Sequence, residues 1–145
     1  MVIDASVLVD MWVTNRTRHS HAVKLAHYIK VSKKTVTIPM HALLEVKCAI
    51  DNERQTPEHG KLCEDLFTEN EPLQVKYIPI DNAFIHKYLD PSVPYIRAGD
   101  LPYILIAKKH NCPLITEDNQ LYKVAKKAGV VAYKINEYLK LISVS

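Results

Sequence analysis

Short apolar runs alternate along the chain with longer segments in which apolar residues recur at helical spacing. The apolar runs predict strands at residues 2–4, 35–39, 73–80, 114–116 and 130–133. The periodic segments predict helices at residues 6–12, 19–31, 40–52, 57–69, 82–88, 101–109, 119–128 and 136–142. Asp81 and Asp100 are the expected caps of two helices, and Gly129 is the expected stop of another. This alternation predicts an α/β fold, a three-layer α/β/α arrangement around a central, mostly parallel sheet.

Length and composition are typical of one globular domain that spans residues 1–145. The three cysteines, Cys48, Cys63 and Cys112, are widely spaced without a CxxC pair, which argues against a disulfide framework. No apolar run approaches the ~18 residues of a membrane span, and the first residues lack the basic region of a signal peptide. We therefore expect a cytoplasmic protein without a membrane anchor.

The formal net charge of +3 permits a polyanionic partner but does not identify one. Lysines cluster at residues 30–34, 108–110 and 123–127, and solvated helix ends explain these clusters as well as a bound polyanion does. The chain has three glycines and neither a GxGxxG nor a P-loop pattern. A dinucleotide cofactor and a P-loop nucleotide are therefore not expected.

Four acidic residues stand out by their context. Asp4 and Asp118 follow apolar strands, whose carboxyl ends form the ligand-binding edge of a parallel sheet, although turn formation there is the competing explanation. Asp100 follows Gly99 at a predicted helix start, where a plain helix cap is the alternative. Glu45 lies within a helix and has no Lys or Arg three or four residues away. If buried, Glu45 needs a cation or a functional role, and otherwise it points to solvent.

Carboxylates gathered at one sheet edge would repel one another. Each pair about 4 Å apart costs on the order of 1 kcal/mol in water and more in a partly buried site. A hard divalent cation removes this penalty, and all-oxygen ligation suits Mg²⁺ or Mn²⁺. Such a site points to phosphate chemistry, in which the metal orients a phosphodiester and activates water.

Four segments in this order resemble the motifs of PIN-domain ribonucleases, including the VapC-type toxins of prokaryotic toxin–antitoxin pairs. They are VIDASVLVD at residues 2–10, LEV at 44–46, AGDL at 98–101 and LITED at 114–118. The resemblance extends over essentially the whole chain. It implies a parallel sheet flanked by helices and hydrolysis of RNA by metal-activated water. It also implies that Mg²⁺ or Mn²⁺ is held by Asp4, Glu45, Asp100 and Asp118.

The resemblance also implies roles for residues around these acids. Ser6 and Thr116 would steady the metal ligands. Asp118 is preferred over its neighbours Glu117 and Asn119, either of which would supplement it. For Asp10, a solvated helix position is favoured over a role behind the metal ligands.

The sequence gives weaker signals for the residues that would contact RNA or partner proteins. Arg97, Tyr95 and Tyr103 are candidate phosphate or base-stacking contacts, with a surface charge and packing aromatics as equal alternatives. The family resemblance raises a homodimer, to which Trp12 and the early helices would contribute apolar surface, and a cognate antitoxin.

Three other functions compete with a toxin ribonuclease. The first is a stand-alone RNA-processing nuclease, and the second is a PIN-like RNA-binding or scaffold module without catalysis, against which the four acids argue. The third is a phosphoryl-transfer domain with Asp4 as nucleophile. It is disfavoured because Asp4-Ala5-Ser6 lacks the second acid of a DxD pattern.

Overall fold

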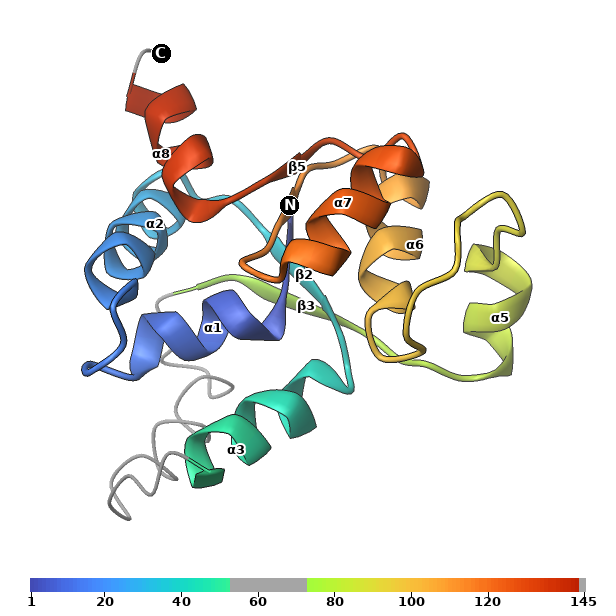
Figure 1. Ribbon diagram of the computed structural model, residues 1–145, viewed down its shortest axis with the longest axis horizontal. Helices are drawn as coiled ribbons and strands as arrows, with labels where there is room; N and C mark the ends of the chain where they lie inside the picture. The colour runs from blue at the N-terminus through green and yellow to red at the C-terminus, as the bar shows by residue number, and fades with distance from the viewer. Residues whose placement is uncertain (53–72, 144–145) are drawn as a thin grey trace.

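The computed structural model describes residues 1–52 and 73–143, so the helix predicted at residues 57–69 lies outside the described residues. Five parallel strands form one sheet in the order β3-β2-β1-β4-β5 (Figure 1). They are β1 (Val2–Ile3), β2 (Val36–Pro39), β3 (Val75–Ile78), β4 (Leu114–Ile115) and β5 (Ala132–Tyr133). The predicted α/β fold with a parallel sheet is confirmed.

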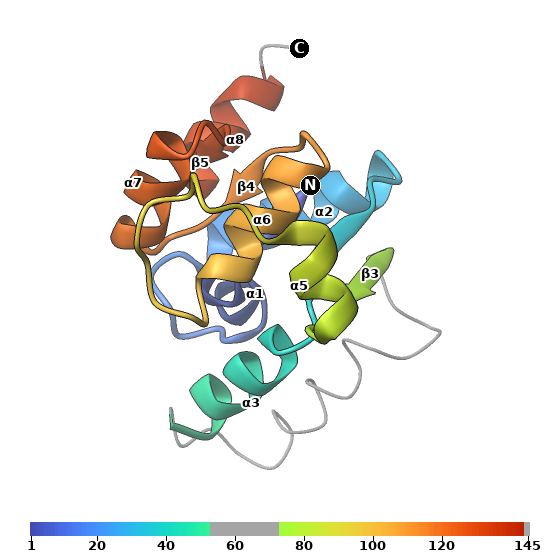
Figure 2. The same ribbon diagram turned by 90° about the vertical axis from the view of Figure 1, so that its right-hand side faces the viewer.

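The helices occupy both faces of this sheet. They are α1 (Ala5–Trp12), α2 (His19–Val31), α3 (Ala42–Asn52), α5 (Asn82–Tyr88), α6 (Leu101–Lys109), α7 (Asn119–Lys127) and α8 (Ile135–Ser143). Helix α1 packs against α2 and α3, and α2 packs against α8, whereas α6 lies over β2, β1 and β4 beside α5. Figure 2 shows α5 and α6 in front of the sheet and α1 and α2 behind it. Right-handed crossovers give this division, because the chain reverses its direction across the sheet after β3.

Local chemistry sets several of the helix ends as predicted. Asp81 caps α5, where its side chain accepts a hydrogen bond of 2.8 Å from the backbone N–H of Phe84. Gly129 follows α7 with a φ of +80°, a conformation that glycine adopts at little cost. No helix formed by the described residues is long and apolar enough to cross a bilayer.

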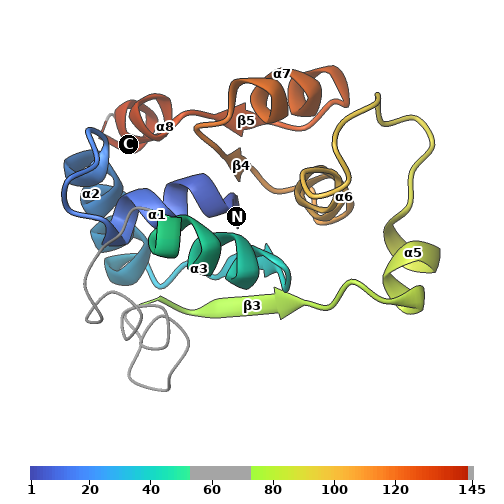
Figure 3. The same ribbon diagram turned by 60° about the horizontal axis from the view of Figure 1, so that its bottom comes forward.

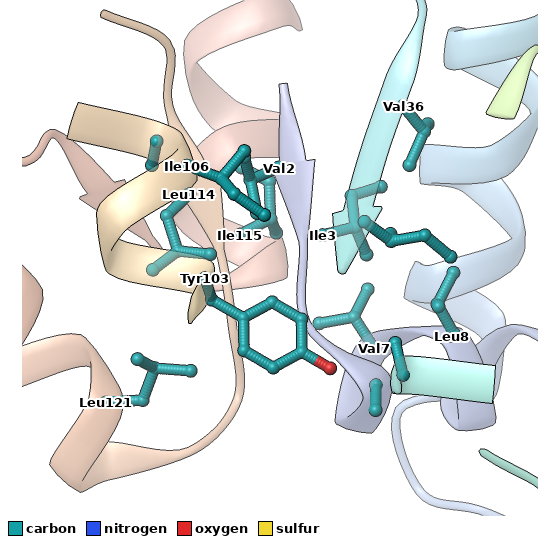
Figure 4. Close-up of a cluster of buried hydrophobic side chains, with 14 of the residues drawn as sticks. Val2, Ile3, Val7, Leu8, Val36, Tyr103, Ile106, Leu114, Ile115 and Leu121 are labelled. Carbon is teal, nitrogen blue, oxygen red and sulfur yellow. The ribbon is translucent and has the colours of Figure 1, made fainter. Parts of the chain in front are cut away.

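The core surrounds the central strands β1 and β4. Val2, Ile3, Leu114 and Ile115 are fully buried, and side chains of α6 and α7 cover them from one side (Figure 4). Ile3 pairs with Ile115 in the sheet, so the next residues, Asp4 and Thr116, leave the two strands side by side. The sheet thereby brings two polar residues 112 positions apart to the same edge.

Candidate active site

The site begins at Asp4, which ends β1 and precedes α1. The Asp4 Oδ2 atom accepts hydrogen bonds from the Ser6 hydroxyl at 2.5 Å and from the Thr116 hydroxyl at 2.8 Å. Each hydroxyl also accepts a backbone N–H of the loop after β4, Ser6 from Glu117 at 3.3 Å and Thr116 from Asp118 at 3.0 Å. Both hydroxyls therefore tie the Asp4 carboxylate to the segment that carries Asp118.

Burial makes the Asp4 carboxyl a weaker acid than an ordinary aspartic acid. Desolvation raises the pKa of Asp4 from 3.8 to about 6, although the hydrogen bonds from Ser6 and Thr116 favour the charged form. The nearby negative charges of Glu45 and Asp100 make a smaller contribution to this rise in the pKa of Asp4. Three of the four predicted acids thus lie close enough to interact electrostatically.

Glu45 enters the site from α3 and meets α6. The hydroxyl of Tyr103 donates a hydrogen bond of 2.6 Å to Glu45 Oε2. The Glu45 side chain is 37% exposed, but its carboxylate is hydrogen-bonded to Tyr103 of α6. It does not simply point to solvent, which was the alternative that the sequence left open. Tyr103 itself is fully buried, so the expectation that its ring stacks on an RNA base is wrong for this structure. Burial and the neighbouring Asp4 charge raise the pKa of this tyrosine well above its usual range.

Arg97 joins the other two acids. Its guanidinium donates to Asp100 Oδ2 at 2.9 Å and to Asp118 Oδ2 at 3.2 Å. Asp100 stands at the cap position of α6, but its side chain makes no capping hydrogen bond, so the plain helix-cap alternative is wrong. Asp118 does cap its helix, because its Oδ1 accepts the backbone N–H of Leu121 at 2.8 Å.

Glu117 and Asn119 do not join Asp118 at the site. Glu117 Oε1 accepts the backbone N–H of Ile135 at 2.8 Å, at the start of α8, and Glu117 Oε2 lies 3.8 Å from Arg18. Asn119 is exposed at the first turn of α7. The structure thus gives Glu117 a structural contact and leaves Asp118 beside Arg97 and Thr116.

The interpretation of Asp10 as a solvated residue is wrong. Its side chain is fully buried and pairs with Arg16 at 3.1 Å and with Arg18 at 2.6 Å. The carbonyl oxygen of Asp10 also bonds the His19 ring at 3.0 Å. Asp10 therefore fastens the segment between α1 and α2, and its charge is neutralised by arginines.

Of the candidate RNA contacts, two are accessible. Tyr95 is 89% exposed, and the side chain of Arg97 is 62% exposed. Sequence reasoning missed His41, whose ring lies 4.0 Å from Glu45 and bonds the carbonyl of Gly99 at 2.8 Å. The spacing of His41 four residues before Glu45 is the one sequence signal for this contact.

The donor set is that of a hard-cation site, but its members are not drawn together. Among residues 1–52 and 73–143, no three His, Cys, Asp or Glu side chains are grouped tightly enough to hold a metal ion as they stand. Arg97 supplies positive charge to Asp100 and Asp118, while Asp4 and Glu45 are bound by hydroxyls. Burial and, to a smaller extent, repulsion from Glu45 and Asp100 raise the pKa of Asp4, and a bound divalent cation would offset both effects, so the chemistry of the residues fits one.

A parallel α/β sheet with acidic side chains at its carboxyl edge defines the class of this molecule. A family model of the PIN domain matches residues 1–127, which is most of the chain. The chain therefore belongs to the PIN-domain family. A search of curated protein sequences found no match.

Solved structures share the fold over nearly their whole length. VapC20 of Mycobacterium tuberculosis, described as a sarcin-ricin-loop-cleaving toxin, has 14% sequence identity and a TM-score of 0.63, covering 90% of this chain and 95% of that chain. FitAcB from Neisseria gonorrhoeae has 17% identity and a TM-score of 0.62, covering 92% of this chain and 96% of that chain. At these identities the likeness establishes the fold alone.

Proposed function

We propose that this PIN-domain protein is a metal-dependent endoribonuclease that hydrolyses RNA phosphodiester bonds with activated water. The observation that carries the proposal is the environment of Asp4. Its carboxylate is held by two hydroxyls, and burial, with a smaller contribution from Glu45 and Asp100, raises its pKa to about 6. An ionised carboxylate in this position lowers the stability of the fold unless a cation binds it. Acids with pKa values perturbed in this way are concentrated at functional sites.

Asp4, Glu45, Asp100 and Asp118 would hold the ion, Mg²⁺ or Mn²⁺. When bound, the ion supplies a Lewis acid for the phosphate and lowers the pKa of a water molecule. Ser6 and Thr116 fix the direction of the Asp4 carboxylate, because both donate to the same oxygen. Arg97 would bind a phosphate of the RNA once its two carboxylates turn to the metal, and exposed Tyr95 would stack on a base.

The physiological setting belongs to the same proposal. The protein would act in the cytoplasm as a homodimer and as the toxin of a pair with a cognate antitoxin. The likeness to VapC20, described as a toxin, supports this role. A stand-alone RNA-processing nuclease would use the same site, and expression toxicity that a co-expressed neighbouring gene product relieves distinguishes the toxin from it.

The variant Asp100→Asn tests the proposal. We expect wild-type protein to cleave RNA with Mn²⁺ and not with EDTA, and Asp100→Asn to lose at least 100-fold in rate, as loss of a metal-ion contribution implies. Asp90→Asn is the matched control, because Asp90 is also paired with a cation, Lys108 at 2.8 Å, but lies outside the site.

Cleavage is measured on labelled RNA with protein purified free of host nucleases. Equal rates for wild-type and Asp100→Asn protein would contradict the proposal. RNA binding without any Mn²⁺-dependent cleavage by the wild type would make the chain a non-catalytic RNA-binding module instead.

A further inference from the structure

Two reciprocal contacts join α3 to α6 beside the candidate metal ligands. From the α3 side, the ring of His41 reaches the carbonyl of Gly99 at 2.8 Å, just before α6. From the α6 side, the hydroxyl of Tyr103 reaches Glu45 in α3 at 2.6 Å. The two rings also contact each other edge to face, with centroids 5.6 Å apart. We call these three residues, His41, Gly99 and Tyr103, the clasp.

The direction of each hydrogen bond in the clasp follows from its acceptor. A backbone carbonyl only accepts, so His41 Nε2 carries the proton that it shares with Gly99. Glu45 accepts from Tyr103, because a carboxylate with this partner has lone pairs and no proton to give. Both bonds therefore have a defined donor, and neither requires His41 to be charged.

Burial fixes the Tyr103 ring, and little space surrounds the Glu45 carboxylate that accepts its hydrogen bond. The Tyr103 ring is fully buried, and Figure 4 shows it reaching from α6 towards the start of α1, with the hydroxyl oxygen at its far end. A Cβ atom added at Gly99 would stand 3.3 Å from Glu45 Oε1, which is a tight contact. Glycine at this position thus lets the Glu45 carboxylate lie directly against the turn that leads to Asp100.

Two members of the clasp hold Glu45 in the site: Tyr103 through its hydrogen bond, and His41, whose ring lies 4.0 Å from the carboxylate. The Glu45 side chain is 37% exposed, so without these contacts water would solvate the carboxylate in other rotamers at little cost. Figure 3 shows α3 and α6 as separate helices, and the hydrogen bond from His41 to Gly99 joins the residues that stand just before the first turn of each. The clasp is therefore suited to set the distance between Glu45 and Asp100.

We infer that His41 and Tyr103 are positioning residues that orient Glu45 for the divalent cation, with Gly99 providing the space. This inference rests on the proposed function, since it assigns Glu45 to the metal. Groups that orient metal ligands contribute about 10- to 100-fold to metal affinity or activity. In this chain the histidine stands just before α3, which carries the glutamate, and the tyrosine reaches the glutamate from α6.

The variant Tyr103→Phe removes the hydrogen bond to Glu45 and keeps the buried ring. We expect its affinity for Mn²⁺, measured from the free-ion signal in electron paramagnetic resonance, to fall about tenfold. The rise in melting temperature on adding Mn²⁺ falls with it. Tyr88→Phe is the matched control, because Tyr88 is also buried and its hydroxyl bonds His110 at 3.0 Å, away from the acids.

A second pair of variants tests His41. His41→Ala removes the donor to Gly99, and we expect a loss of Mn²⁺ affinity in the same direction as for Tyr103→Phe. His41→Gln keeps an N–H donor near the same place and is expected to recover part of that affinity. A merely structural role would lower the melting temperature equally with and without Mn²⁺ and would leave Mn²⁺ affinity unchanged.

The outcomes separate the inference from the proposed function. If the wild type binds Mn²⁺ and cleaves RNA but Tyr103→Phe and His41→Ala bind Mn²⁺ as Tyr88→Phe does, the clasp inference is wrong and the nuclease proposal stands. If the wild type neither binds Mn²⁺ nor cleaves RNA, both are overturned. Weaker Mn²⁺ binding in the clasp variants alone supports the inference.

Discussion

At the scale of single residues, the buried carboxyl group of Asp4 lowers the stability of the folded protein when it is ionised. Its folded-state pKa of about 6 lies above its ordinary value of 3.8, because the ionised form is desolvated. The folded state therefore binds a proton more tightly than the unfolded state, and the metal-free protein loses stability as pH rises through this interval. The loss is on the order of 3 kcal/mol when complete.

Asp4→Asn tests this cost. The amide keeps an oxygen that accepts from Ser6 and Thr116 but has no charge to desolvate. In EDTA we expect the variant to be more stable than the wild type by about 2–3 kcal/mol at pH 7.5 and equally stable near pH 4. Urea denaturation at the two pH values measures the difference, and a constant difference between them would refute the argument.

Arg97 is a cation of the chain itself that contacts two of the four acids, Asp100 and Asp118. Because it binds Asp100 and Asp118, a divalent ion must compete with it for both carboxylates. We expect Arg97→Gln to bind Mn²⁺ about two- to fivefold more tightly, since an exposed pair is weak, and to bind RNA less tightly in EDTA. Calorimetric titration with Mn²⁺ and RNA-binding assays measure the two effects. Lower affinity for Mn²⁺ would show that Arg97 supports the ion.

At the scale of elements, two adjacent residues in the loop after β4 contact different parts of the molecule. Asp118 faces the site, whereas Glu117 accepts the first N–H of α8 and approaches Arg18. We expect Glu117→Ala to destabilise the protein by about 1 kcal/mol, the value of a lost helix cap, without changing Mn²⁺ affinity. Chemical denaturation and Mn²⁺ titration check this separation. Asn119→Ala, at an exposed position, serves as the control, and a drop in Mn²⁺ affinity for Glu117→Ala would assign Glu117 to the metal.

The sequence predicted the elements well because their signals are local. Periodicity placed α2 and α5, and the position of Asp4 and Asp118 after apolar runs placed both at one sheet edge. The strands are shorter than predicted, because apolar residues continue beyond the ladder into the packed turns, as at Val130.

Side-chain partners were not predictable in the same way. The sequence does not reveal that Asp10 is buried, because its arginine partners, Arg16 and Arg18, follow in a turn without periodicity. The residues around Tyr103 in the sequence do not reveal that its hydroxyl bonds Glu45, which is 58 residues away. A role in base stacking is therefore as compatible with the sequence as a buried position. Such pairings depend on how α3 and α6 meet, which only the assembled fold determines.

At the scale of the whole molecule, the proposed role of Asp4 as a metal ligand would link metal binding to proton binding. A divalent ion must displace the proton that Asp4 holds below about pH 6. We expect Mn²⁺ to raise the melting temperature more at pH 7.5 than at pH 5, and Asp100→Asn to show a much smaller rise at both. Thermal unfolding with and without Mn²⁺ at the two pH values decides this. An equal rise at both would exclude Asp4 from the metal site.

The hydrogen bond from Thr116 to Asp4 spans 112 residues of the chain. The strand β1 is synthesised long before β4, so the Asp4 carboxylate at its end meets Thr116 only when β4 has formed beside it. On a ribosome, this edge of the sheet therefore stays incomplete until Thr116 has been synthesised and β4 has paired with β1.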